Sequence, residues 1–416
     1  MIKQKLKMKS MKKSIFKPMI IALAMTTLLF SCEDEPTVKT LESGAELQGE
    51  VTEDITLVKD GTYYLSGGYE VLDGVTLTIE EGVEIIAIDD DIVDYILIEQ
   101  GGKIEAEGTA SNPIVMTAEV EEAGAWGGIH ICGKAPINVT GATSLSEIGD
   151  APYGGNDPSD NSGTLRYVRI EWAGYAFSEE KEANGFTFYG VGNGTTVEYC
   201  QAYRGSDDGY EFFGGTVNVK HVVSTDNSDD SFDWTEGWTG KGQFMLAYQT
   251  DASILGYECD CLMECDNNAN NNELTPISCP VLANVTLIGN NSTTTHRGIR
   301  LRAGTYVKLY NALVTGKPDC ITTETTYTEN SLLSGSSILD YVYLANTINC
   351  KEGIYSEALF TSNEHNAINQ NLSFSSKYVG IIAGGTNMST VDSFFDNASY
   401  KGAVDPSDNW TSGWTR

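Results

Sequence analysis

The segment from residue 197 to residue 238 contains one sequence unit twice. The first copy, VEYCQAYRGSDDGYEF, begins at Val197, and the second, VKHVVSTDNSDDSFDW, begins at Val219. Self-similarity at a period of about 20–50 residues indicates a repeat architecture, in which each unit buries its apolar face against the next copy. Both copies consist of short β-type runs broken by Gly, Asn and Asp, without the apolar spacing of a helix. The segment therefore predicts two stacked coils of a solenoid.

Alternating apolar and polar residues extend this pattern along the chain, as expected for strands with one buried face. Glycine is abundant (43 residues) and proline is scarce (10), which suits many tight turns between short strands. We therefore predict an all-β fold, a single right-handed parallel β-helix domain over residues 46–416. The strand pattern is clearest at 55–58, 71–86, 96–109, 280–289 and 306–314.

Two polar stretches interrupt the strand pattern, at about 139–162 and about 251–277. Both are predicted to be loop insertions between coils. The last coil of a solenoid exposes unpaired backbone groups, which invite edge pairing unless something covers them. The C-terminal tail with Trp410 and Trp414 is predicted to be that cap.

The first thirty-two residues have the layout of a bacterial lipoprotein signal. Lys3 to Lys17 is basic, Met19 to Phe30 is an apolar run too short for a permanent membrane span, and the sequence Leu-Phe-Ser-Cys ends at Cys32. This ending resembles a lipobox, in which the cysteine is acylated and becomes the new N-terminus. An ordinary signal peptide with a chance cysteine is the alternative. We predict a signal peptide at 1–31, lipidation of Cys32 and a tether at 32–45, held at the membrane by its acyl chains.

Directly after that cysteine, Glu33-Asp34-Glu35 resembles the acidic surface-export signal of Bacteroidota lipoproteins. The expected location is therefore the outer membrane, lipid-anchored and facing the cell exterior. With 26 basic against 58 acidic residues, the net charge is −32. A surface this negative repels phosphate backbones, so no nucleic-acid partner is expected.

Seven sequence blocks make the chain resemble Bacteroidota surface lipoproteins of the right-handed parallel β-helix type. Together they cover nearly the full length after the signal segment, but the resemblance implies a fold and no activity. The blocks lie at Asp73–Val83, Ala106–Ala118, Trp126–Asn138, Gly163–Gly174, Asp207–Thr216, Asp229–Trp238 and Trp410–Thr415.

The duplicated unit also provides a candidate metal site. If its period is one coil, equivalent acidic residues of the two copies lie about 5 Å apart, where like charges repel by roughly 3 kcal/mol at an effective dielectric of 20. A shared cation would relieve this, and calcium accepts several oxygen ligands in loose geometry. Turn residues that bind backbone amides, or an acid/base pair acting on a glycan, are the alternatives. The candidate ligands are Asp207, Asp208, Glu211, Asp229, Asp230 and Asp233.

Aromatic residues surround this acidic set in the sequence. Exposed rings in a groove would stack on sugar faces, whereas rings inside stacked coils would fill the interior. The candidate ligand-binding residues are Trp172, Tyr210, Trp234 and Trp238.

Four cysteines lie within or just after the second predicted insertion. An even number of cysteines in an exported protein favours disulfides, with free thiols and a zinc-type cluster as alternatives. The candidate disulfide residues are Cys259, Cys261, Cys265 and Cys279.

These features favour a non-catalytic surface lipoprotein that binds an extracellular ligand, with a glycan as one candidate ligand and calcium as one candidate cofactor. An outer-membrane receptor or transporter is a candidate partner. A polysaccharide lyase or glycoside hydrolase on the same scaffold is the first alternative, and an adhesin or structural surface protein is the second. No residue is assigned a catalytic role, because fold does not imply function. An arginine or lysine within reach of the acidic residues would favour an enzyme.

Overall fold

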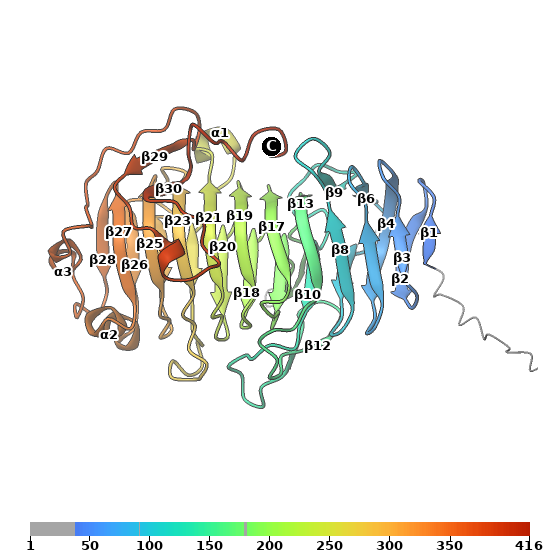
Figure 1. Cartoon of the computed structure of the whole chain (residues 1–416), viewed down its shortest axis with the longest axis horizontal. Helices are drawn as coiled ribbons and strands as arrows, with labels where there is room; N and C mark the ends of the chain where they lie inside the picture. The colour runs from blue at the N-terminus through green and yellow to red at the C-terminus, as the bar shows by residue number, and fades with distance from the viewer. Residues whose placement is uncertain (1–37, 91, 179–180) are drawn as a thin grey trace, which may run out of the picture. The chain divides into compact units, whose positions relative to one another are not determined.

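A computed structural model describes residues 38–90, 92–178 and 181–416, and its main element is a 24-stranded sheet in which every pairing is parallel. Strands do not pair with the next strand in sequence but with the equivalent strand of the next coil (Figure 1). This pairing defines the predicted parallel β-helix. The first half of the sheet contains β1 (Lys39–Leu41), β2 (Glu46–Val51), β3 (Ile55–Leu57), β4 (Thr62–Val71), β5 (Thr76–Ile79), β6 (Glu84–Ala87), β7 (Tyr95–Ile98), β8 (Lys103–Glu107), β9 (Ile114–Ala118), β10 (Ile129–Cys132) and β13 (Gly163–Glu171).

The duplicated unit is one coil, as predicted. Val197 pairs with Val219 in one ladder, and Glu211 pairs with Asp233 in the other. The same two ladders continue to the end of the sheet. Its second half contains β16 (Phe186–Tyr189), β17 (Thr196–Tyr203), β18 (Tyr210–Phe213), β19 (Asn218–Thr225), β20 (Phe232–Thr235), β21 (Lys241–Tyr248), β22 (Met263–Cys265), β23 (Val281–Ile288), β24 (Arg297–Leu301), β25 (Lys308–Thr315), β26 (Asp319–Thr323), β27 (Ile338–Leu344) and β28 (Thr347–Cys350).

Stacked aromatic rings fill the middle of the coil interior. Phe186 lies 4.8 Å from Tyr210, and Tyr210 lies 5.3 Å from Phe232, measured between ring centroids. Each such pair contributes about 0.5–1.5 kcal/mol beyond the burial of its apolar area. Because every ring repeats at the same position of successive coils, the sequence repeat becomes a continuous core.

In the ladder that contains β13, β17, β19 and β21, a column of residues in the left-handed backbone conformation bends the strands. Tyr167, Tyr199, His221 and Phe244 have φ between 51° and 57°, and each interrupts the pairing of its strand. Their side chains point out of the coil and stack, with Tyr199 and His221 only 4.3 Å apart between ring centroids. Because paired strands carry the left-handed residue at the same register position, successive coils bend together and remain aligned.

The C-terminal tail does not cover the end of the solenoid, so the prediction for Trp410 and Trp414 is wrong. Trp414 packs on the flank against Val223 and Leu246, and its carbonyl oxygen accepts a hydrogen bond from Arg169. The tail thus runs back along the stacked column toward earlier coils (Figure 1). It contains β29 (Gly380–Ala383), the 3-10 helix η1 (Met388–Thr390) and β30 (Tyr400–Val404).

Two short helices close the C-terminal end instead. Phe360 of α3 (Glu357–Ser362) is fully buried in the main core. The carboxylate of Glu329 in α2 (Thr326–Ser334) accepts hydrogen bonds from the backbone amides of Glu352, Ile354 and Tyr355. The C-terminal cap is therefore present, but a different segment makes it.

The structure tests the predicted N-terminal boundary and the first predicted insertion. The signal segment and Cys32 lie outside the described residues. Strand β1 is already part of the first coil, so the predicted tether is wrong from residue 39 onward. The stretch at 139–162 is a loop insertion with a small antiparallel hairpin of β11 (Ser144–Leu145) and β12 (Pro152–Tyr153). No helix in the described part of the chain is long and apolar enough to cross a membrane.

The second predicted insertion is interrupted by a coil strand. Strand β22 lies inside the range 251–277, yet it pairs with β20 before it and β24 after it. The interpretation as one continuous loop is therefore wrong. Only the segments on either side are loops, the first of which contains α1 (Ala252–Leu255).

Candidate functional site

Successive coil corners form an acidic groove. The corners before β18 and β20 each carry the pair of aspartates predicted from the duplication, and the corner before β22 adds Asp260. The hollow between them has a volume of about 360 Å³. Its lining residues, named here the acidic groove, are Glu147, Glu182, Asn184, Asp207, Asp208, Glu211, Asp229, Asp230, Asp233, Asp260, Glu264 and Arg300.

One row of the groove is a ladder of side chain to backbone hydrogen bonds. Asn184 Oδ1 accepts from the amide of Asp208 (3.2 Å), and Asp208 Oδ1 accepts from the amide of Asp230 (2.9 Å). Asp230 Oδ1 then accepts from the amide of Cys261 (2.6 Å). Asp208 and Asp230 therefore act as the turn residues that the alternative interpretation predicted. Each carboxylate still has a second oxygen for another partner.

A second row lies on the outer face of the strands. Glu211, Asp233 and Glu264 occupy the same register position in β18, β20 and β22. Asn184 Nδ2 donates to Glu211 Oε2 at 2.6 Å. Asp233 Oδ1 is buried and has no hydrogen-bond partner among the described residues. A buried carboxylate oxygen without a donor costs free energy. A proton or a cation bound at this row would lower that cost.

Burial and mutual repulsion raise the pKa values of these carboxyls. Desolvation, followed by Glu182 and Asp229, raises the pKa of Asp207 to about 8. Desolvation, followed by Glu236, raises the pKa of Glu147 to about 7. The pKa values of the buried Asp208 and the partly buried Asp233 also lie well above 3.8, again because of burial first and neighbouring carboxylates second. Arg300 is the one basic residue of the lining, and Arg297 and Arg302 pair with the lining residues Asp260 and Glu264 from outside it. Protons or cations must balance the remaining carboxylates.

The carboxylates meet the geometric requirement of a calcium site. Ligand oxygens 2.3–2.6 Å from one Ca²⁺ lie at most about 5 Å from one another. One oxygen each of Asp207, Asp208 and Asp229 lie within 4.8 Å of one another. The same holds for the groups Asp208–Glu211–Asp233 and Asp230–Asp233–Glu264. The six residues predicted as metal ligands are therefore brought together in one place.

Arg300 and Arg302 are part of this site, although the sequence could not place them. Arg300 Nη1 donates to Glu264 Oε2 at 2.6 Å, and Arg302 Nη2 lies 2.9 Å from Glu264 Oε1. Burial by itself lowers the pKa of Arg300, but Glu264 and Glu324 outweigh it and raise the net value. Arg300 therefore stays charged, which makes it a poor general base and a good electrostatic partner.

The predicted ligand-binding aromatics are not exposed. Tyr210, Trp234 and Trp238 are completely buried, and Trp172 is 7% exposed. Tyr210 and Trp234 point into the coil because strand alternation places them opposite the acidic row. Trp238 follows β20 and stacks on Phe212 in the same core. Trp172 lies at a corner beneath the guanidinium groups of Arg204 and Arg416. The prediction that these four rings stack on a ligand is therefore wrong.

The predicted disulfides are also absent. All eight cysteines in the described residues are free thiols, including Cys259, Cys261, Cys265 and Cys279. Cys265 lies in register between Trp234 and Leu301, inside the core. The sulfur atom of Cys265 therefore contributes packing and no cross-link. Cys261 Sγ instead lies beside Asp260 and Glu264 of the acidic groove, and Cys279 is only partly buried.

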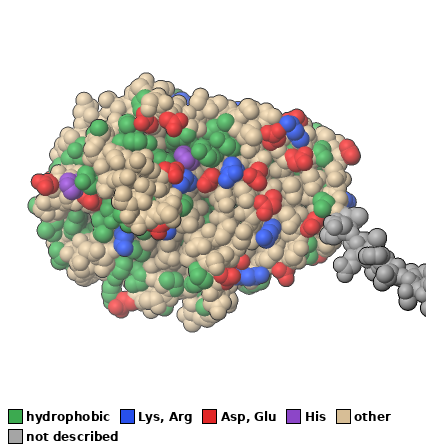
Figure 2. Space-filling model, viewed as in Figure 1, with side chains coloured by type: hydrophobic (Ala, Val, Ile, Leu, Met, Phe, Trp, Pro, Cys, Tyr) green, Lys and Arg blue, Asp and Glu red, His purple; other side chains and the backbone are tan. Residues whose placement is uncertain are grey.

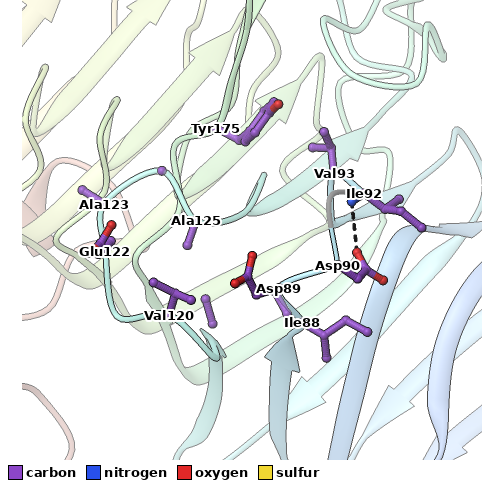
Figure 3. Close-up of a pocket in the computed structure, with 13 residues that line it drawn as sticks. Ile88, Asp89, Asp90, Ile92, Val93, Val120, Glu122, Ala123, Ala125 and Tyr175 are labelled. Atoms are coloured by element: carbon purple, nitrogen blue, oxygen red, sulfur yellow. Dashed lines mark hydrogen bonds between the residues drawn. The ribbon is translucent and has the colours of Figure 1, made fainter.

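A second hollow, of about 490 Å³, shares no lining residue with the acidic groove and is named here the Tyr175 hollow. In Figure 3 the carboxylate of Asp89 points into it, with Ile88 and Val120 below and Tyr175 opposite. Tyr175 is 36% exposed and Phe177 is 40% exposed. The hairpin of β14 (Ala176–Ser178) and β15 (Lys181–Glu182) follows Tyr175 and ends at Glu182, a lining residue of the acidic groove.

The acidic groove concentrates the negative charge that the whole chain carries. On the face shown in Figure 2, acidic and basic side chains are interspersed. Ion pairs such as Arg166 with Glu107 and Glu198 account for part of this mixture. Acidic residues outnumber basic ones over the whole chain, 58 to 26, and the acidic groove gathers ten of them around one arginine.

Comparison with known proteins gives the family and no closer relative. No curated protein and no solved structure matches the chain. The family model described as pectate-lyase like beta helix domain matches residues 49–415, which is almost the whole of the described chain. Together with the two parallel ladders and the stacked interior, this match shows that the chain belongs to the pectate-lyase like β-helix domain family.

Proposed function

We propose that the protein is a non-catalytic, calcium-dependent binder of an extracellular glycan. The observation that carries this proposal is the acidic groove, where ten carboxylates and a single guanidinium line about 360 Å³. Ionised together without a cation, these groups would repel one another strongly. A hard divalent cation removes that repulsion, and calcium suits a cluster of carboxylate oxygens with irregular geometry.

The Tyr175 hollow supports a sugar as the ligand. Its volume falls within the roughly 300–1,000 Å³ typical of ligand sites. The exposed ring of Tyr175 offers a stacking face for the C–H side of a pyranose, and the carboxylate of Asp89 accepts hydrogen bonds from hydroxyl groups. The hairpin between the hollow and the groove gives calcium a route to affect ligand binding, because Glu182 lines the groove.

Calcium binding is tested by isothermal titration of the chelator-treated protein. The wild type is expected to bind calcium and gain thermal stability, since a ligand of the folded state stabilises it. The double variant Asp207→Asn, Asp229→Asn is expected to bind at least about tenfold more weakly, because two charged ligands are lost. Asp73→Asn is the matched control, since the side chain of Asp73 is 80% exposed and does not line the groove. Equal affinities in the three proteins would contradict the proposal.

A polysaccharide lyase or glycoside hydrolase is the second candidate, and one observation favours it. Arg300 follows Glu264 in the register of the acidic row, so a cation lies within reach of the carboxylates. The two candidates differ in product. Retention on a glycan array without new reducing ends or unsaturated sugars supports binding, whereas turnover that Asp208→Ala or Asp230→Ala abolishes supports an enzyme.

We further propose that Cys32 carries the lipid anchor and that the protein faces the medium from the outer membrane. An outer-membrane receptor or transporter would then receive the captured glycan. Cys32→Ser is expected to move the protein from the membrane fraction to the soluble fraction, because acyl chains no longer hold it. Protease treatment of intact cells then tests the orientation, with degradation expected for the wild type. Membrane retention of the serine variant would contradict the anchor.

A further inference from the structure

Lys317 is a fully buried lysine for which the proposed function has no role. It lies in the turn between β25 and β26, and its side chain is 0% exposed. The stem crosses directly over Gly289, where an added Cβ would lie 2.6 Å from Lys317 Cγ. A side chain at position 289 would therefore displace the lysine, so glycine there keeps a channel open for it.

The ammonium group lies among uncharged oxygen atoms. Lys317 Nζ donates to the carbonyl oxygens of Cys259 (2.9 Å) and Thr295 (2.9 Å) and to Asn290 Oδ1 (2.8 Å). Burial lowers its pKa to about 8, although the surrounding Cys259, Asp260, Cys261 and Glu258 raise it in part. At pH 7 about a tenth of the molecules would then hold the neutral, nucleophilic amine.

The side-chain amide of Asn290 is held in one orientation against this amine. Asn290 is 1% exposed, and its Oδ1 accepts from Lys317 Nζ and from the amide of Ser292 (3.2 Å). Two donors on one oxygen polarise the carbonyl and make its carbon more electrophilic. Its Nδ2 donates to Glu258 Oε2 (3.2 Å) and to the carbonyl of Cys259 (3.2 Å). A carboxyl group therefore lies beside the nitrogen that would leave.

The two residues lie on turns that are themselves bonded together. The amide of Gly289 donates to the carbonyl of Thr315 at 2.8 Å, and the amide of Asn291 donates to the carbonyl of Gly316 at 2.9 Å. The backbone thus fixes the amine and the amide relative to each other in consecutive coils. Fixed reactants of this kind reach effective concentrations far above those in solution.

We propose that Lys317 and Asn290 form an intramolecular isopeptide bond. The lone pair of neutral Nζ attacks Asn290 Cγ, a C–N bond forms, and the Cγ–Nδ2 bond breaks. One proton from Nζ passes through Thr295 Oγ1, which accepts from Nζ at 3.3 Å and donates to Glu258 Oε2 at 3.2 Å. The Glu258 carboxyl group then delivers a proton to Nδ2, which leaves as ammonia. No oxidant or reductant is required. The bond joins two consecutive coils at a corner next to the loop that carries Asp260 of the acidic groove.

Peptide mapping of the purified full chain by mass spectrometry tests this bond. The wild type is expected to yield a branched peptide that joins the fragments containing residues 290 and 317, lighter than their sum by one ammonia. Lys317→Arg and Asn290→Ala are expected to yield only the two linear peptides. Lys401→Arg is the matched control, because Lys401 is 2% exposed and donates to the carbonyl oxygens of Ala383 and Gly384. This variant should keep the branched peptide.

Glu258→Ala distinguishes a chemical role from a structural one. Glu258 is exposed, so the variant is expected to fold as the wild type does, yet to form the branched peptide at least about tenfold more slowly, as for loss of a general acid. Folded wild-type protein that yields only linear peptides, before and after prolonged incubation, would overturn the proposal. That result is decisive even if a variant at position 317 does not fold.

Discussion

Raising the pH from about 5 to about 8 in the presence of a chelator is expected to lower the free energy of unfolding by roughly 2–4 kcal/mol. Asp207, with a pKa of about 8, and Glu147, with a pKa of about 7, keep protons in the folded state that the unfolded chain releases near pH 4. The folded state therefore binds more protons over this range, and its stability falls as the pH rises. Each retained proton contributes about 1.4 kcal/mol per pH unit, and water in the open groove reduces the sum.

Calcium is expected to remove most of this loss. A bound cation replaces the protons, so saturating calcium should flatten the dependence of unfolding free energy on pH above about 6. Urea unfolding at several pH values, with chelator or with calcium, measures both slopes. The double variant Asp207→Asn, Asp229→Asn should show a shallower slope with chelator than Asp73→Asn does. Burial lowers the pKa values of His130 and His221 to about 4 and about 3, which by itself makes stability rise with pH up to about 6.5. The groove is therefore tested by the difference in slope between the double variant and Asp73→Asn, and equal slopes would show that the groove carboxylates ionise without penalty.

The alignment of the acidic residues in neighbouring coils could be predicted from the sequence, because the spacing of the duplicated unit equals one coil. Aligning Ser206-Asp207-Asp208 with Ser228-Asp229-Asp230 gives the pairing that the backbone adopts, and with it the proximity of the carboxylates. Local sequence was sufficient here, since consecutive coils lie side by side.

The inward orientation of the aromatic rings could also have been predicted from the sequence. Tyr210 and Phe212 flank Glu211 in one strand, so strand alternation places both rings opposite the carboxylate. Once Glu211 is assigned to the groove, the rings must point inward. The exposed ring of Tyr175 carried no comparable signal, because its hairpin lies outside the repeat.

The other missed features depend on contacts between distant parts of the chain. Arg169 binds the carbonyl oxygen of Trp414, and Arg416 pairs with Glu171. No periodic pattern links such positions, so the tail could not be placed on the flank. Strand β22 was missed for a different reason: it has only three residues and lies between polar loops. It belongs to the coil because it pairs with β20 and β24, and its own composition does not predict a strand.

Trp234→Ala is expected to destabilise the protein by about 3–5 kcal/mol, the cost of removing a large ring from a closed core. The ring is fully buried, its centroid lies 5.6 Å from that of Trp238, and its Nε1 donates to Thr305 Oγ1 at 3.1 Å. The cavity left behind spans neighbouring coils, which cannot collapse into it without breaking their register. Denaturant unfolding of the variant measures the loss.

Tyr175→Ala is the matched comparison, because it removes an exposed ring from the proposed sugar site. Its unfolding free energy is expected to stay within about 0.5 kcal/mol of the wild type, as for most surface substitutions. Its retention on a glycan array should be lost, whereas Trp234→Ala should retain the ligand at temperatures where it is folded. The reverse pattern, with a stable Trp234→Ala that no longer binds, would place the ligand inside the region assigned here to the core. Stability and retention measured on the same two variants therefore separate a packing role from a recognition role.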